Sequence, residues 1–457
     1  MSRSAPLVLS CKVFAADILG LDEHPPSRPL SIVSRRAIGV NGSDDANNAL
    51  SELCFNTHLA DAPGLSRLTL GRTGVRYMSI LAMDYKLIVL GSRLPVGNTN
   101  GPSGLSSQVY LLYDAVEQSI AMISSYPWTM MPQRPGEMRE TAFVMSPLIA
   151  RAPGGRRYAL LDMAETTIYS GYKHRTVHKH DVLYIWRSWY PGWNMITTRF
   201  PAEFKGDYVD HSYTTVLSFS CGGRAFWVNL LRGAMYCSLD ALLSASNELE
   251  FGFLGLPAEL PREIPGNLMC AYEMCSDMFR TMGRAGESSV KFVTIDGFLQ
   301  HLDFVDCTLK VWSLISPQSG MCRWSTERSI CLGSLAKQDE FKKAGLPTDM
   351  VPMYPSLNPE EDDVVYFMLG KYELCCKCNS HSKSKERCNG HVTTAQNPLY
   401  HLRVDMRRGL LLGAARFPDQ TSPSVVLADT SVLPSPIVQR ESTAGRKRKR
   451  RRAALTE

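Results

Sequence analysis

Short apolar runs recur along most of the chain, and clusters of Gly, Pro, Asn and Asp separate them. From about residue 65 onward the runs are rich in Val, Ile, Tyr, Trp and Phe, which suit a half-buried pleated surface. The pattern is typical of many short strands and predicts an all-β chain. The clearest predicted strands are 87–90, 109–113, 158–161, 182–186, 226–231, 291–294, 309–314, 364–369 and 410–412.

Helical periodicity is weak by comparison. Residues 239–249 and 335–344 give the best predicted helices, and both are short. Residues 1–60 are irregular, with a polar cluster at 41–45. We expect a first strand or two in that segment, followed by a loop.

Two stretches share one pattern, in which an apolar strand carries a tryptophan, crosses a Pro/Gly turn and meets a second tryptophan. This pattern predicts a β-hairpin with an aromatic partnership across the strands. The predicted pairs are Trp186 with Trp193 across 191–192, and Trp312 with Trp324 across 317–320.

Three further hairpins are predicted where a strand ends on an Asx residue, whose side chain is suited to hold a tight turn. These residues are Asp114, Asn229 and Asp405. They lie 115 and 176 residues apart, which is roughly two and three times a spacing near 58. Such a spacing is that of a long propeller blade with insertions, although any β-rich chain of this length yields some coincidences of this kind.

Together these patterns predict an all-β, mainly antiparallel fold, namely a β-propeller-like repeat of five to seven four-stranded blades. Residues 1–60 form an irregular N-terminal segment with candidate ring-closing strands. Residues 61–418 form the propeller-like domain, and residues 419–457 a disordered tail. Tryptophans Trp186, Trp193, Trp227, Trp312 and Trp324 are expected to pack in the core, the alternative being a stacking platform for bases or sugars.

The composition limits the cellular compartments in which the protein is expected. The 457 residues allow a sizeable core, and no apolar run approaches the roughly 20 residues that span a bilayer, so no membrane partner is expected. The apolar patch at 7–9 is too short for a signal peptide. Thirteen scattered cysteines favour reduced thiols in the cytosol or nucleus.

The net charge of +6 depends on one tract near the C-terminus. Seven consecutive cations contribute +7, which leaves −1 for the rest of the chain. A body with so little net charge does not attract phosphates, so nucleic-acid contact is expected only through the tail. The tract consists of Arg446, Lys447, Arg448, Lys449, Arg450, Arg451 and Arg452.

This tract predicts a nuclear-import signal, because a solvated run of cations fits the acidic groove of an import carrier. Nonspecific contact with RNA or DNA is the alternative. We therefore expect a nuclear protein that is present in the cytoplasm as well.

Soft metal ligands gather at one place, where Cys376, Cys378, Cys388 and His391 could hold zinc. Their spacing matches no common structural finger, and a flexible loop with reduced thiols is the simpler interpretation. A second stretch, with His174, His178, His180 and Asp181 just before a strand, could bind a metal or supply a general base, but a solvated loop is the simpler interpretation. No metal and no cofactor are expected.

Several segments in order resemble a known family. They are GRAFWVNLLRGAMYC at 223–237, VWSL at 311–314, YPSL at 354–357, DDVVYF at 362–367 and VDMR at 404–407. The series resembles the domain of unknown function 1618, a plant family expanded in grasses, over residues 65 to 420. It is also similar to propeller-type domains attached to F-box proteins, in which a glycine-led strand like Gly223 to Trp227 is typical.

The resemblance implies a propeller fold and brings no established catalytic residues. F-box-associated domains present substrates to ubiquitin ligases, but residues 1–50 contain no Leu-Pro-led helical module that could serve as an F-box. The common phosphate-binding, metalloprotease and hydrolase motifs are absent from the sequence as well. We therefore expect a non-catalytic protein-interaction scaffold or adaptor with an unidentified protein partner. The alternatives are a nucleic-acid-associated protein that uses its tail and, with less support, an enzyme.

Overall fold

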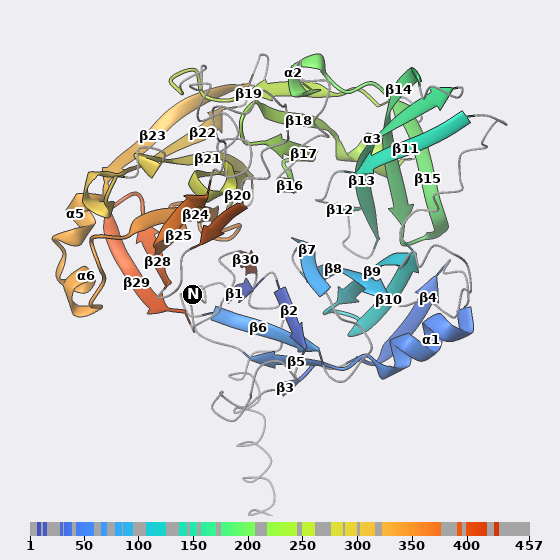
Figure 1. Cartoon of the computed structure of the whole chain (residues 1–457), viewed down its shortest axis with the longest axis horizontal. Helices are drawn as coiled ribbons and strands as arrows, with labels where there is room; N and C mark the ends of the chain where they lie inside the picture. The colour runs from blue at the N-terminus through green and yellow to red at the C-terminus, as the bar shows by residue number, and fades with distance from the viewer. Residues whose placement is uncertain are drawn as a thin grey trace, which may run out of the picture.

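In the computed structural model, most of the described residues form short strands. The described residues are 7–10, 12–15, 28–30, 32–38, 43–58, 65–70, 78–84, 86–94, 107–124, 137–143, 147–152, 157–170, 175–205, 217–244, 249–260, 276–286, 288–298, 302–315, 322–375, 391–394, 399–417 and 425–428. The predicted all-β class is confirmed, and the strands form sheets that stand side by side around a common axis (Figure 1).

Five antiparallel four-stranded sheets make up most of the ring, and we number them blades 1 to 5 in chain order. Blade 1 is β7 (Met78–Asp84), β8 (Leu87–Leu94), β9 (Ser107–Asp114) and β10 (Ser119–Ser124). Blade 2 is β12 (Leu148–Arg151), β13 (Tyr158–Ser170), β14 (Arg175–Arg187) and β15 (Tyr190–Thr198), with β11 (Glu137–Phe143) paired to the far half of β13.

The remaining three blades have the same order of strands from the axis outward. Blade 3 is β16 (Leu217–Cys221), β17 (Arg224–Asn229), β18 (Gly233–Ser238) and β19 (Gly252–Gly255). Blade 4 is β20 (Arg280–Ala285), β21 (Ser289–Asp296), β22 (Thr308–Ile315) and β23 (Arg323–Cys331). Blade 5 is β24 (Val351–Leu357), β25 (Val364–Gly370), β28 (Tyr400–Asp405) and β29 (Leu410–Arg416).

A sixth sheet, here called the closing sheet, fills the gap between blades 5 and 1. Its strands run in the order β30 (Val425–Ala428), β1 (Leu7–Ser10), β6 (Leu65–Leu70), β5 (Phe55–His58) and β3 (Arg28–Pro29). Strand β2 (Lys12–Ala15) joins β6 to β7 of blade 1. The closing sheet therefore combines strands from both ends of the chain.

The innermost strands complete the ring. Strands β7, β12, β16, β20, β24 and β30 each contact the next in that order, and β30 contacts β7 again. Strand β30 has the same direction as β7, because β30 is antiparallel to β1, β1 and β2 are both parallel to β6, and β2 is antiparallel to β7. It therefore takes the innermost place that each blade's own first strand takes elsewhere.

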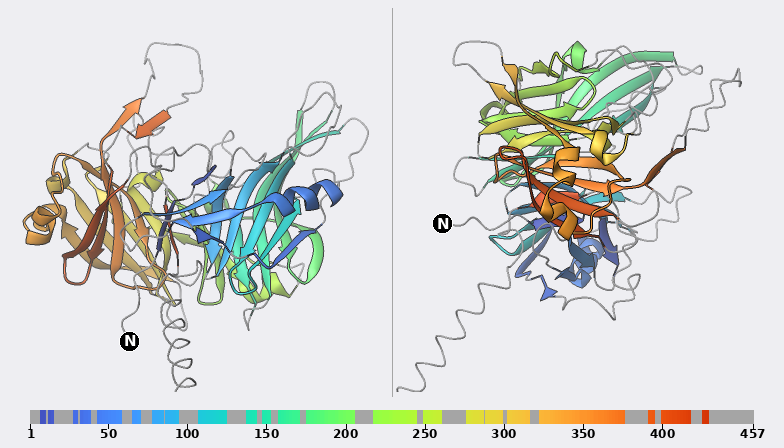
Figure 2. Two further views of the ribbon diagram at one scale, coloured as in Figure 1. Left: turned by 90° about the horizontal axis from the view of Figure 1, so that it is seen from below. Right: turned by 90° about the vertical axis from the view of Figure 1, so that its left-hand side faces the viewer.

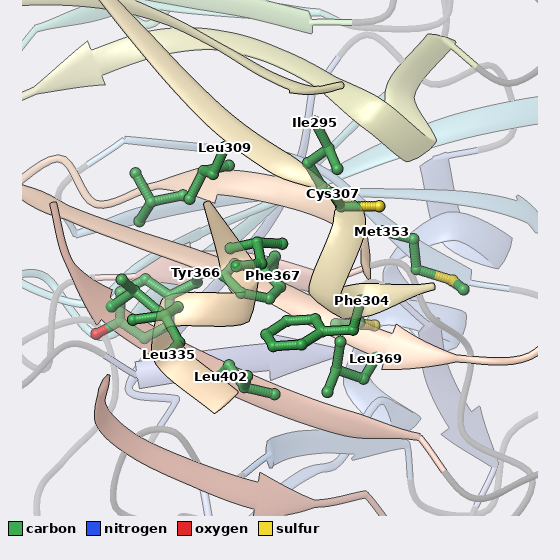
Figure 3. Packing of buried hydrophobic residues seen from close by; sticks show 14 of the residues in the cluster. Ile295, Phe304, Cys307, Leu309, Leu335, Met353, Tyr366, Phe367, Leu369 and Leu402 are labelled. Atoms are coloured by element: carbon green, nitrogen blue, oxygen red, sulfur yellow. The ribbon is translucent and has the colours of Figure 1, made fainter. Parts of the chain in front are cut away.

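The sequence pattern follows from burial between blades. All seven residues of β25 are buried, since the middle strands of a blade are covered on both faces, and such strands read as continuous apolar runs. Side chains from neighbouring blades meet in separate clusters, of which the largest lies between blades 4 and 5. Figure 3 shows Phe304 and Phe367 at the centre of that cluster.

The N-terminal segment departs from the expected loop. Residues Ser43–Glu52 form helix α1, and strand β4 (Ser34–Ile38) pairs in parallel with β10 at the outer edge of blade 1. The polar cluster that indicated a loop lies in part at the start of this helix, where acidic side chains are favourable. Arg35 caps the C-terminal end of α1, because its Nη1 donates to the carbonyl oxygens of Leu50 and Leu53 at 2.9 and 2.8 Å.

The remaining helices are short. They are α2 (Ala202–Lys205), α3 (Leu239–Leu243), α5 (Leu332–Ala336), α6 (Asp339–Lys343) and the 3-10 turn η4 (Phe304–Asp306). The predicted helix at 239–249 stops after its first five residues, and the one at 335–344 is divided into α5 and α6. No helix in the described ranges has the length and apolar character needed to cross a bilayer.

One tryptophan hairpin has the predicted pairing and the other does not. Trp186 and Trp193 are direct partners, but Trp324 is opposite Leu314 while Trp312 is opposite Thr326. The offset is set where the hairpin pairing begins, at Ile315 with Arg323, and the register is regular from there to Trp312 with Thr326. A count of residues in the sequence does not reveal where this pairing begins.

The expected turn at 191–192 is also wrong. The chain reverses at Ser188 and Trp189, and Gly192 lies inside β15 with φ of +103°, a value that favours glycine. The expected turn at 317–320 lies outside the described residues.

Candidate functional site

The innermost strands of the blades end on one side of the ring, here called the turn face. The turns between the first and second strands and between the third and fourth strands of each blade lie on this side. Figure 2 shows the two sides of the ring edge-on, and the ribbon of β26 (Tyr372–Cys375) and β27 (His391–Thr394), in orange, projects from the opposite side.

Charged residues end two innermost strands at the turn face. Asp84 is the last residue of β7, and Arg151 is the last residue of β12. Arg151 Nε donates to Asp84 Oδ2 at 3.2 Å, and its Nη2 donates to the backbone oxygen of Asp84 at 3.0 Å. Only 12% of the Asp84 side chain and 18% of the Arg151 side chain are exposed. The pair therefore joins blades 1 and 2 in a largely dry setting.

A second arginine, from across the ring, acts on the charge of Asp84. Arg284 is the penultimate residue of β20, which is the third strand along the ring from β7 in either direction and therefore faces it. Burial raises the pKa of Asp84 above its ordinary value, and the charges of Arg151 and then Arg284 lower it. Two cations from blades 2 and 4 thus act on one carboxylate near the ring axis.

The buried cysteines of the described residues are not activated. Cys221, the last residue of β16, is buried, and burial raises the pKa of its thiol although Arg284 lowers it. Burial also raises the pKa values of Cys237 and Cys307 to about 12. These three thiols stay protonated at neutral pH and are poor nucleophiles.

Apolar side chains are exposed at equivalent positions around the turn face. Each lies where the third strand of a blade turns into the fourth, and they are Val116 in blade 1, Tyr190 in blade 2, Ile315 in blade 4 and Leu410 in blade 5. We call this set the apolar rim. In blade 3 the helix α3 takes the corresponding place. Val116 and Tyr190 are the most exposed members, at 60% and 56%.

A carboxylic acid is buried between blades 1 and 2. Asp162 on β13 is 1% exposed, and its Oδ2 accepts a hydrogen bond of 2.7 Å from the hydroxyl of Tyr110 on β9. Burial raises the pKa of Asp162 to about 7, an effect that the Tyr110 hydrogen bond opposes. Trp193 contacts the Tyr110 ring, with 6.2 Å between ring centroids. The carboxyl group therefore sits in an aromatic interface rather than at an open surface.

The three Asx residues hold turns. Asp114 Oδ1 accepts from the backbone nitrogens of Val116 and Glu117 at 2.8 and 3.2 Å. Asn229 Oδ1 accepts from the nitrogen of Leu231 at 2.9 Å. Asp405 Oδ1 accepts from the nitrogen of Arg408 at the same distance.

Four of the five tryptophans are buried, namely Trp186, Trp193, Trp227 and Trp312. The fifth, Trp324, is half-buried, and its Nε1 donates to the backbone oxygen of Gly255 at 2.7 Å. Trp324 therefore links blade 4 to blade 3. These positions place the rings in the contacts between and within blades, where they are not available as a stacking platform.

The proposed metal ligands are not placed together by the described residues. Cys376, Cys378 and Cys388 lie outside those residues, as does the tract 446–452, and His391 is described only as part of the strand β27. Among the side chains that are described, no three His, Cys, Asp or Glu residues are grouped to hold a metal ion. His174 also lies outside the described residues. The expected solvated loop is wrong for the rest of that stretch, since His178, His180 and Asp181 belong to strand β14. Asp181 is buried there, and its Oδ2 accepts from the nitrogen of Phe200 at 2.8 Å.

Sequence reasoning missed Asp84, Arg151 and Arg284. They are far apart in the chain, and each is an ordinary charged residue next to a turn, so no local motif identifies them. The one available signal was positional, since Asp84 and Arg151 each end an apolar run that becomes an innermost strand. That signal is useful only after the strand order is known.

Comparison with known proteins gives one family match. Residues 227–366 match the model of a family described as "Protein of unknown function (DUF1618)". This region runs from β17 of blade 3 through blade 4 to β25 of blade 5. The resemblance to this family is confirmed, while the plant origin and the likeness to F-box-associated domains stay predictions. No curated protein matches the chain.

Proposed function

We propose that this chain, which carries a DUF1618 region in a β-propeller, is a non-catalytic protein-interaction scaffold or adaptor that acts in the nucleus. The apolar rim is the observation that carries the proposal. Large apolar side chains exposed at the same position of several blades form a recurring feature of one face, whereas isolated exposed apolar residues are ordinary.

The rim is well placed for binding a protein. Its residues lie at the ends of tight hairpins whose strands are buried between blades, so they are held on a rigid frame. Residues ordered before binding cost less conformational entropy when a partner binds. An aromatic residue such as Tyr190 supplies a large contact area with few rotatable bonds. The turn face therefore offers several anchors to one partner.

Substitution of the rim tests this role. The variant Val116→Glu with Tyr190→Glu places charges in the proposed interface, and we expect loss of the proteins that the wild type captures reproducibly from nuclear extract. The control variant is Leu302→Glu with Val305→Glu, because these apolar residues are exposed on the opposite face, beside η4. Quantitative mass spectrometry compares the three captures, and circular dichroism checks the fold of each variant. Equal capture by the rim variant would contradict the proposal.

Nuclear action depends on the tract 446–452 as an import signal. We expect a fluorescent fusion with alanine at all seven positions to lose its nuclear accumulation. A fusion with seven alanines in the preceding segment 432–438 is the matched control. Retained accumulation in the tract variant would remove the nuclear part of the proposal.

A further inference from the structure

Cationic and aromatic side chains gather on the turn face of blade 2, where it borders blade 3. Arg157 directly precedes β13, and its backbone oxygen accepts from the nitrogen of Ala152 at 2.8 Å. Its guanidinium carbon lies 5.9 Å from the centroid of the Trp189 ring, at the turn between β14 and β15. Arg157 is exposed, Trp189 is half-buried, and the next residue, Tyr190, is 56% exposed. Arginine, tryptophan and tyrosine are the residue types that dominate binding at protein interfaces.

A second guanidinium lies beneath these residues. Arg187, the last residue of β14, is 4% exposed and pairs in register with Ala159. Because Arg157 lies two residues before Ala159, the two arginines leave the same face of the sheet, with their Cβ atoms about 7–8 Å apart. Ala159 faces the apolar cluster shared with blade 3, whereas Tyr158 faces the one shared with blade 1. Arg187 Nη2 accordingly donates to the carbonyl oxygen of Leu242 in α3 of blade 3, at 2.9 Å.

These four side chains, Arg157, Arg187, Trp189 and Tyr190, are here called the blade 2 corner. In the described ranges no ion pair joins either arginine to a carboxylate. The Nε of Arg187 also has no hydrogen-bond partner there. A buried charge without a counter-ion is unfavourable, so a carboxylate that binds close to it is stabilised. The corner therefore attracts a negative group.

Its aromatic rings determine what else binds there. An apolar side chain can pack against Trp189 and Tyr190, which supply contact area with few rotatable bonds. A carboxylate next to that side chain can accept two parallel hydrogen bonds from the guanidinium of Arg157. Both groups occur together on a polypeptide that carries Asp or Glu beside an apolar residue.

We propose that the blade 2 corner binds an acidic segment of a protein partner. An Asp or Glu of the segment contacts Arg157, a neighbouring apolar side chain packs on Trp189 and Tyr190, and the charge of Arg187 strengthens the attraction from below. The inference rests on the proposed scaffold function, because Tyr190 belongs to the apolar rim, and it adds the chemical class of the partner.

Selection from a displayed library of random peptides, with the full chain as the bait, tests the corner. We expect the enriched peptides to carry Asp or Glu next to an aromatic or aliphatic residue. Fluorescence anisotropy of one enriched peptide should show binding to Arg157→Gln that is about tenfold weaker than to the wild type. Arg187→Gln keeps a donor for Leu242 and loses only the charge, so its binding should be about threefold weaker. Selection on Arg157→Glu should enrich Lys and Arg instead.

Arg199→Glu is the matched control. Arg199 is exposed and follows β15, so it lies on the opposite face of the same blade. The substitution changes the charge of blade 2 as Arg157→Glu does, but away from the corner. Its enriched peptides and its affinity should equal those of the wild type.

Three outcomes would overturn the inference. They are a selection that enriches no peptides with acidic residues, equal affinities of the wild type and Arg157→Gln, and displacement of the labelled peptide by a single-stranded DNA oligonucleotide at a lower concentration than by the unlabelled peptide. The last outcome would assign the corner to nucleic acid. Thermal unfolding checks each variant, and the Arg157 variants, which alter an exposed side chain, keep the test valid if Arg187→Gln does not fold.

Capture from nuclear extract separates this failure from a failure of the scaffold function. Proteins that are lost with Val116→Glu and Tyr190→Glu but retained by Arg157→Glu would leave the scaffold in place and remove the acidic partner. Proteins lost from both variants and retained by Arg199→Glu would support both.

Discussion

The buried acid Asp162 makes the stability of the protein depend on pH. Its pKa is about 7 in the folded protein because burial disfavours the charged form, whereas the carboxyl of an unfolded chain has a pKa near 3.8. A group whose pKa is raised by folding adds stability below the unfolded value, and this stability is lost as the pH rises through the folded value. The loss should therefore extend from about pH 4 to pH 7.

We expect Asp162→Asn to remove this dependence. Asparagine cannot ionise, so its unfolding free energy does not fall with pH in this way. Relative to the wild type, the variant should therefore become more stable by up to about 4 kcal/mol between pH 4 and pH 8. Urea unfolding at several pH values measures the difference. Asp349→Asn is the control, since that side chain is 67% exposed and its charge stays solvated. Parallel pH profiles for the wild type and Asp162→Asn would contradict the assignment.

Trp227 tests the packing of a single large side chain between blades 2 and 3. It is fully buried, and no hydrogen-bond partner of its Nε1 is found among the residues that the structure describes. Trp227→Ala should lower the free energy of unfolding by about 3–5 kcal/mol, because it leaves a large cavity. Trp227→Phe keeps most of the apolar volume and removes the indole N–H, so its cost should be much smaller. Chemical denaturation compares the two, and equal losses would argue against a packing role.

Neighbouring blades are joined by ionic contacts as well as by apolar ones. Lys291 on β21 is 3% exposed, and its Nζ lies 2.9 Å from Glu327 Oε2 and 3.3 Å from Asp362 Oδ1. It also donates to the backbone oxygen of Asp362 at 2.6 Å. Because Asp362 precedes β25, this lysine connects blade 4 to blade 5.

We expect Lys291→Ala to cost about 1–3 kcal/mol, since it breaks a buried charged hydrogen bond. The acidic partners are partly exposed and can regain water, which limits the loss. Lys310→Ala is the matched control, because the exposed pair of Lys310 with Asp296 lies within blade 4 and should contribute less than about 1 kcal/mol. Thermal unfolding of both variants checks the order, and a larger effect at Lys310 would contradict it.

Strands were predictable from sequence where their packing requires a local pattern, such as an apolar run or a turn residue. The run that became β25 is apolar throughout because it is covered on both faces, and the turn at Asp114 is held by its own side chain. The register of Trp312 with Thr326 was not predictable, since it depends on the pairing that begins at Ile315 with Arg323, and no local pattern marks that starting point. The pair of Asp84 and Arg151 was hidden for a related reason, because the two residues are 67 positions apart and meet only when blades 1 and 2 stand side by side.

Closure of the ring depends on both ends of the chain. Strand β30 takes the innermost place of the closing sheet, and β1 pairs with it along four residues, with Val8 opposite Leu427 and Leu9 opposite Val426. Other blades are made of strands close together in sequence, so the closing sheet has the largest loop-closure cost in entropy. It should therefore be the first part of the ring to open.

A disulfide across this pairing tests the closure. Neighbouring antiparallel pairs alternate between wide and narrow separations, so one of Val8→Cys with Leu427→Cys and Leu9→Cys with Val426→Cys should have the spacing that a disulfide needs. The disulfide links strands from the two ends of the chain, so the oxidised variant should be more stable by about 2–4 kcal/mol. This gain should vanish on reduction. Leu9→Cys with Leu427→Cys is the control, because adjacent positions of a strand point to opposite faces. Peptide mapping identifies the bond, and thermal unfolding with and without reductant measures its effect. If only the control pair formed the bond, β30 would not close the ring in this register.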